Sequence, residues 1–106
     1  EKDIITARIL SNNFASEKSI KVFNQGFEDF QSETRFDLII GNVPFGNYGV
    51  YDKVLHKQYS HLYNNRIHNY FFLKASQQLK PGGIMAMLTT SSMLLQTTAV
   101  HLAVLM

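Results

Sequence analysis

The sequence contains no cysteine among its 106 residues. This excludes a disulfide-linked scaffold and a cysteine-ligated zinc site, and it fits a reducing cytoplasm. No apolar run approaches the ~18–20 residues that a membrane-spanning helix needs, so we expect a cytoplasmic protein with no membrane partner. Charge is nearly balanced, since ten Lys and Arg against eight Asp and Glu leave a net charge of +2. So small an excess does not by itself identify a nucleic-acid-binding protein.

The composition is that of a packed globular core. The chain is 45% hydrophobic, 12% aromatic and only 17% charged, which excludes a disordered tail, a collagen-like repeat and a coiled coil. Its length suits one domain, so we assign residues 1–106 to a single domain. The chain begins at Glu1 without an initiator Met and ends in an apolar segment without a helix cap. We therefore expect a fragment of a longer domain.

The first half of the chain predicts one helix and two strands. Residues 3–10 carry apolar side chains at helical spacing, with Asp3 as the N-cap and Asn12-Asn13 as a stop. Residues 20–23 read as a short strand, followed by a polar loop around Gly26. The apolar, β-branched run at residues 36–40 is a better strand.

The second half predicts a long loop, a helix and a buried strand. Residues 41–66 lack periodicity, and their aromatic content argues for a functional loop. Ile67 begins an apolar stripe that recurs every four residues, and Pro81-Gly82-Gly83 is expected to stop this helix. Residues 84–89 are apolar on both faces, as in buried parallel strands. With a last helix or irregular tail over residues 93–106, the order predicts an α/β fold with a mainly parallel sheet and flanking helices.

Asn42-Val43-Pro44-Phe45-Gly46 directly follows the strand at residues 36–40. Ligands of open parallel sheets bind beyond the carboxyl ends of the strands. Asn42 offers an amide oxygen, and Pro44 stiffens the turn so that the Val43 carbonyl is held in place. These two acceptors can orient one exocyclic amino group for methyl transfer, and Phe45 can stack on a planar base. The competing interpretation is an ordinary turn, since Asn, Pro and Gly are common turn residues.

At these residues the chain resembles the N6-adenine DNA methyltransferases, whose motif is Asp/Asn-Pro-Pro-Tyr/Phe. The context is similar too, because a Phe-Asp-Leu-Ile-Ile-Gly strand precedes the motif and a helix with a Leu-Lys-Pro-Gly-Gly turn follows it. The nearest likeness is to the methylase region of bacterial DNA methylase/helicase proteins, in which Asn-Val-Pro-Phe-Gly replaces the double proline. The resemblance covers about residues 1–92, most specifically 36–46 and 68–90.

The resemblance implies part of a Rossmann-like, S-adenosylmethionine-dependent enzyme that methylates adenine N6 in DNA, in bacterial restriction–modification or on a mobile element. Asn42, Val43, Pro44 and Phe45 would be its catalytic residues. Cofactor contacts would come from Glu1 to the ribose and from Phe27 and Glu28 near the adenine, with Asp29 as an alternative acid. The family's glycine-rich cofactor motif, first strands and last strands are not in this sequence. We therefore expect this segment alone neither to bind the cofactor tightly nor to methylate.

Basic side chains follow the motif, interleaved with aromatic residues. Lys53, Lys57 and Arg66 are candidates for contacts with DNA phosphates, although a solvated surface is the ordinary interpretation. His56, His61 and His68 lie at spacings of 5 and 7, which miss the i,i+4 pairing of metal ligands. We predict no metal site.

Two alternatives stay open at this stage. Related motifs serve amino-group methyltransferases that act on protein glutamine or on rRNA, with nearly the same geometry. A methyltransferase fold can also be a non-catalytic scaffold inside a larger helicase-bearing protein. The apolar C-terminal segment, with Leu102, Val104 and Leu105, is a candidate dimer contact.

Overall fold

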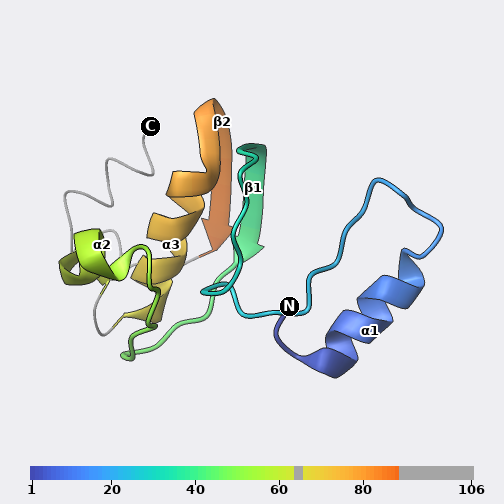
Figure 1. Ribbon diagram of the computed structural model, residues 1–106, viewed down its shortest axis with the longest axis horizontal. Coiled ribbons are helices and arrows are strands. Elements are labelled where there is room, and N and C mark those ends of the chain that lie inside the picture. The colour runs from blue at the N-terminus through green and yellow to red at the C-terminus, as the bar shows by residue number, and fades with distance from the viewer. Residues whose placement is uncertain (64–65, 89–106) are drawn as a thin grey trace. The chain divides into compact units, whose positions relative to one another are not determined.

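The computed structural model describes residues 1–63 and 66–88 (Figure 1). The chain divides into two compact units, Glu1–Gln31 and Ser32–Met106. The elements follow one another as α1 (Ile4–Asn13), β1 (Phe36–Asn42), α2 (His56–Tyr63), α3 (Ile67–Gln78) and β2 (Leu79–Leu88).

The first unit contains α1, which begins and ends as the sequence predicts. The Asp3 side chain caps the helix, because its Oδ2 accepts a hydrogen bond from the backbone N–H of Thr6 at 2.7 Å. The hydrogen bonds from the backbone and the side chain of Thr6 lower the pKa of the Asp3 carboxyl. The helix ends at Asn13, and Ala7 is its buried residue. The capping residue Asp3 and the helix-ending Asn12-Asn13 therefore sufficed to predict this helix from the sequence.

The strand predicted over residues 20–23 does not form. A strand needs a neighbouring strand to satisfy its backbone groups. Here the backbone bonds differently: the Phe23 carbonyl accepts a bond from the N-terminal amine of Glu1 at 2.9 Å. The Asn24 side chain donates to the carbonyls of Glu1 and Lys2. The beginning of the chain and residues 23–24 are thus joined without a sheet ladder.

The second unit contains a parallel pair of strands, as predicted. Leu38 of β1 pairs with Ile84 of β2, and Asn42 pairs with Leu88. Because the strands are parallel, α2 and α3 lie in the connection between them. Helix α3 lies between α2 and the sheet (Figure 1). The core forms between α3 and one sheet face, where the buried Val43 and Phe72 pack against the partly buried Phe71, Met85 and Met87.

The join between α3 and β2 differs from the prediction. The helix ends at Gln78 and β2 begins at once at Leu79, so Pro81-Gly82-Gly83 is not the helix stop. Instead it lies inside the strand, where the pairing shifts: Phe36 is opposite Leu79, but Leu38 is already opposite Ile84. The extra residues of β2 therefore bulge. Gly82 has φ 78°, which an L side chain rarely adopts.

Two further predictions for this unit are wrong. The strand predicted over residues 84–89 is described to residue 88 and is not buried on both faces, because Ile84 and Leu88 are each more than half exposed, as are Leu38 and Ile40 of the neighbouring β1. Within the described part of the second unit, one face of the sheet is thus uncovered. Helix α2 also forms inside the segment 41–66 that was predicted to be a loop. The predicted tail at residues 93–106, with its candidate dimer contact, lies outside the described residues.

Two further expectations concern membrane-spanning helices and metal sites. No helix within residues 1–63 and 66–88 is long and apolar enough to cross a bilayer. In the same part of the chain, no three or more His, Cys, Asp or Glu side chains gather where they could hold a metal ion.

Candidate active site

The turn after β1, residues 42–46, is called the motif turn below. The structure brings its four predicted catalytic residues to the carboxyl end of β1. Asn42 is the last residue of the strand and is exposed. Val43 is 4% exposed and packs with Phe72 of α3, whereas the Phe45 ring is 48% exposed. A buried valine thus anchors the turn between an exposed amide and an exposed aromatic ring.

The start of helix α3 contacts the C-terminal end of the motif turn. The backbone N–H of Ile67 donates to the Gly46 carbonyl at 3.4 Å. The rings of Phe45 and His68 meet edge to face, with their centroids 6.4 Å apart. The first turn of α3 therefore contacts the turn by backbone and by side chain.

His68 is a site residue that the sequence analysis considered only as a metal ligand. It is 4% exposed, and neither ring nitrogen has a hydrogen-bond partner among the described residues. Burial, together with the positive charge of Arg66, lowers the pKa of His68. The imidazole beside Phe45 is therefore neutral at pH 7, and its nitrogens can donate one hydrogen bond and accept another.

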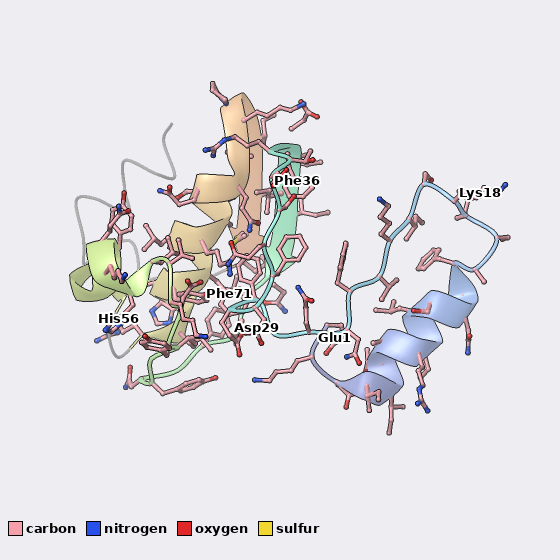
Figure 2. All side chains as sticks on the ribbon, viewed as in Figure 1. Glu1, Lys18, Asp29, Phe36, His56 and Phe71 are labelled. Carbon is pink, nitrogen blue, oxygen red and sulfur yellow. The ribbon has the colours of Figure 1, made fainter. Side chains whose placement is uncertain are left out.

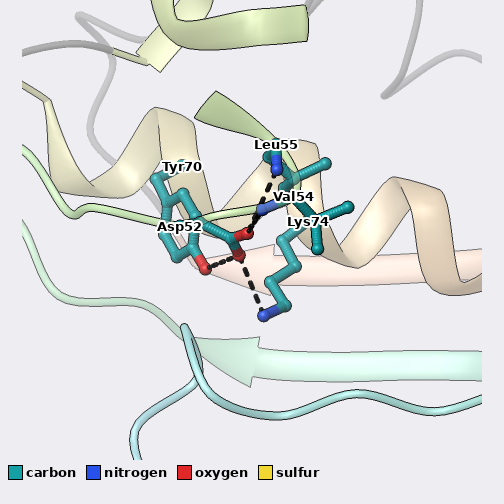
Figure 3. A network of polar contacts seen from close by, with 5 residues as sticks. All are labelled: Asp52, Val54, Leu55, Tyr70 and Lys74. Atoms are coloured by element: carbon teal, nitrogen blue, oxygen red, sulfur yellow. Dashed lines mark hydrogen bonds and ion pairs between the residues drawn. The ribbon is translucent and has the colours of Figure 1, made fainter. Parts of the chain in front are cut away.

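A buried polar group lies farther along the same segment (Figure 3). Asp52 Oδ1 accepts from the backbone N–H groups of Val54 at 2.9 Å and Leu55 at 3.1 Å. Its Oδ2 accepts from the Tyr70 hydroxyl at 2.6 Å and from Lys74 Nζ at 3.1 Å. We call Asp52, Tyr70 and Lys74 the Asp52 cluster. Their exposed fractions are 1%, 0% and 4%.

The Asp52 carboxyl is ionised and paired. Burial raises its pKa, but the hydrogen bonds from Tyr70, Leu55, Lys74 and Val54 outweigh burial and leave the pKa below the ordinary value of 3.8. The sequence analysis missed this cluster. The available signal was Lys74, a charged residue one helical turn after Tyr70 in an otherwise apolar stretch, which needs a buried partner.

The predicted cofactor residues Glu1, Phe27 and Glu28 all lie in the first unit, whereas the motif turn lies in the second. Glu1 precedes α1 (Figure 2), and its Oε1 accepts from the backbone N–H of Asp3 at 2.8 Å. The ring of Phe27 stacks on that of Phe30, with the centroids 6.4 Å apart. Glu28 forms an ion pair with Lys2 at 3.2 Å. The two carboxylates are thus held by neighbours within their own unit.

The predicted phosphate contacts lie beyond the motif turn in the second unit. Lys53 and Lys57 are exposed, the first just before α2 and the second within it. Arg66 is half-buried at the N-cap position of α3 and makes no capping bond with its side chain. Lys53 and Lys57 are accessible to a ligand, and Arg66 also contributes positive charge beside His68.

Comparison with known proteins adds one finding to this geometry. No curated protein matches the sequence. The sequence model of the Eco57I restriction-modification methylase family, however, matches residues 1–104. This match includes β1, the motif turn, the Asp52 cluster and β2. The chain therefore belongs to the Eco57I restriction-modification methylase family.

Proposed function

We propose that this chain supplies the amino-group-binding part of an S-adenosylmethionine-dependent methyltransferase that acts on adenine N6 of DNA. The observation that carries the proposal is the motif turn itself. Asn42 and Phe45 are exposed on either side of the buried Val43, at the carboxyl end of β1. Parallel sheets bind their ligands at this edge. Membership of a restriction-modification methylase family supports DNA as the substrate.

The chemistry needs orientation more than a strong base. The Asn42 amide oxygen and the Val43 carbonyl would accept the two hydrogens of the target amino group. Its lone pair would then point at the methyl group of S-adenosylmethionine. The N–C bond would form as the methyl–sulfur bond breaks with its electron pair left on sulfur, and the proton lost by the nitrogen would pass to solvent. Phe45 would stack on the base after it leaves the duplex. Holding reacting groups in this way supplies a large part of the rate gain.

S-adenosylmethionine would supply the electrophilic methyl group when bound. The donor set of the first unit fits this cofactor, because Glu1 presents a carboxylate acceptor to the ribose hydroxyl groups and Glu28 presents one near the adenine. Glu1 uses one oxygen for Asp3, and a carboxylate has acceptor sites beyond one bond. Phe27 offers an apolar ring for the adenine side, stacked on Phe30. These residues would bind the cofactor rather than take part in the transfer.

DNA would approach the motif turn with its phosphates near Lys53, Lys57 and Arg66. Contacts between cations and phosphates position a duplex without reading its sequence. The position of these residues in the segment between the motif turn and α3 supports this role. The small net charge of the chain, +2, gives no support to this role.

The test is a methyl-transfer assay on the full-length protein that carries this chain. Radiolabelled S-adenosylmethionine is offered with duplex DNA, RNA and a release-factor protein in parallel. We expect label on DNA adenine, and a loss of at least about 10²-fold with Asn42→Ala because the amino group is no longer oriented. Asn47→Ala is the matched control, since Asn47 is also exposed and lies just beyond the turn.

Other outcomes separate the alternatives. Label on a glutamine of the release factor, or on RNA, replaces DNA as the substrate but keeps the role of Asn42. Folded protein that labels none of the three and does not bind the cofactor favours a non-catalytic scaffold. Full activity in Asn42→Ala contradicts the assignment of the motif turn.

A further inference from the structure

We infer that Asp52, Tyr70 and Lys74 are positioning residues for the motif turn: the Asp52 cluster holds residues 43–55 against α3, so that Asn42 and Phe45 keep their places. This inference rests on the proposed function. None of the three residues has a place in the chemistry proposed above. Their role is read from how the segment is attached.

The segment after β1 contacts α3 at several positions. Hydrogen bonds join Ile67 to Gly46, and Tyr70 and Lys74 to Asp52. Val43 and Phe45 meet the helix at Phe72 and His68. Positions 67, 70 and 74 are three and four residues apart, and such positions lie on one side of a helix. The end of the motif turn at Gly46 and Asp52 are therefore both hydrogen-bonded to α3, at opposite ends of the intervening loop.

Asp52 also fixes the shape of the chain that follows it. Oδ1 binds the backbone N–H groups of Val54 and Leu55, while the backbone carbonyl of Asp52 accepts from the N–H of His56, the first residue of α2. One side chain thus closes the turn that leads into α2 and ties that turn to α3 (Figure 3). An apolar side chain could fill the same space but could not direct the backbone.

Stability alone is a poor reason to bury this charge pair. The Lys74 and Asp52 side chains are 5% and 1% exposed, and their charges are 3.1 Å apart. Replacing a buried ion pair with well-packed apolar residues is often neutral or stabilising, because desolvation offsets the attraction. What a pair with this many bonds adds is a single defined arrangement. The segment it defines is the one that carries the motif turn.

The consequence for the reaction is a loss of rate without a loss of cofactor binding. Misplacing a reacting group by about 1 Å can lower the rate about 10²-fold. Tyr70→Phe keeps the ring and removes only the hydroxyl that binds Asp52. We expect this variant to lower kcat at least about tenfold, with the KM for S-adenosylmethionine unchanged within about twofold.

The decisive variant is the double substitution Asp52→Asn with Lys74→Met. Asp52→Asn alone removes the negative charge that pairs with the buried Lys74 ammonium and lowers the melting temperature. Adding Lys74→Met removes the ammonium, so we expect the melting temperature to recover while kcat stays low. A purely structural role predicts that both recover together, and that outcome overturns the inference.

The assay uses full-length protein and two controls. Lys80→Met and Asp37→Asn break an exposed ion pair of similar length, 3.1 Å, in the same unit, and we expect both to keep kcat. A duplex with 2-aminopurine at the target position reports stacking of the flipped base, and we expect its fluorescence change to be smaller in Tyr70→Phe. Wild-type protein without methyl transfer contradicts the proposed function, and the positioning role falls with it. Wild-type activity with unchanged kcat in Tyr70→Phe contradicts the positioning role alone.

Discussion

The motif turn and the Asp52 cluster lie in the same unit but are built in opposite ways. The motif turn is a run of five residues that leaves Asn42 and Phe45 exposed. The Asp52 cluster spans 22 positions from Asp52 to Lys74 and is almost fully buried. The difference shows how a site separates its tasks. Groups that meet a ligand must be accessible, whereas groups that fix geometry work best where water cannot compete for their hydrogen bonds.

The largest expected difference between the two regions is in stability. Asp52→Ala removes the carboxylate that pairs with the buried Lys74 ammonium, so we expect the free energy of unfolding to fall by about 3–5 kcal/mol. Asn42→Ala truncates an exposed side chain, and we expect a change within about 0.5 kcal/mol. Denaturant unfolding of the full-length protein, followed by circular dichroism, measures both. Equal losses of unfolding free energy in the two variants would contradict the distinction between an exposed motif turn and a buried Asp52 cluster that fixes geometry.

The strand that leads into the motif turn was predicted correctly because its apolar residues are adjacent in the sequence, whereas the catalytic roles of the turn stay predictions. Asn42, Pro44 and Phe45 have side-chain chemistry that can be interpreted without knowing what they contact. Helix α1 was predictable for the same reason, since Asp3 and Asn13 mark its ends locally. Patterns within a few residues of one another carry this kind of information.

The Asp52 cluster was not predictable, because nothing near Asp52 in the sequence indicates that it meets α3. The strand at residues 20–23 failed for a related reason: its local pattern is that of a strand, but strand formation depends on a partner elsewhere. Pro81-Gly82-Gly83 has the composition of a helix stop, yet the pairing of β2 with β1 extends through it as a bulge. In each case a contact distant in sequence overrode the local preference.

His68 provides a smaller test, because its ring contacts Phe45 of the motif turn. Its pKa in the folded protein lies below the ordinary 6.5, so the unfolded chain takes up the proton first as the pH falls. The contribution of His68 to stability is therefore complete above about pH 6.5 and decreases below it, by about 1.4 kcal/mol per pH unit, until the folded protein is also protonated. Asp52 does not contribute to this pH dependence, because its pKa is below 3.8. Its contribution to stability is lost only as the pH falls below about 3.8.

Unfolding measured between pH 5 and pH 8 checks this expectation. His68→Phe keeps an edge-to-face contact with Phe45 available and removes the titrating group. We expect the variant to lose this part of the pH dependence. An identical pH profile in wild type and variant shows that another group is responsible.

The smallest expected effect on stability comes from the basic residues beyond the motif turn. Lys53 and Lys57 are exposed, so Lys53→Ala and Lys57→Ala should change the free energy of unfolding by less than about 0.5 kcal/mol. DNA affinity should respond instead. Each lost phosphate contact should reduce the steepness of the decrease of log K with log salt concentration by about 0.9. Titration of duplex DNA at several salt concentrations measures that slope. Lys80→Ala is the control, because Lys80 is exposed and bound to Asp37. A slope that falls equally in Lys80→Ala would mean that general charge, rather than the surface beside the motif turn, attracts the DNA.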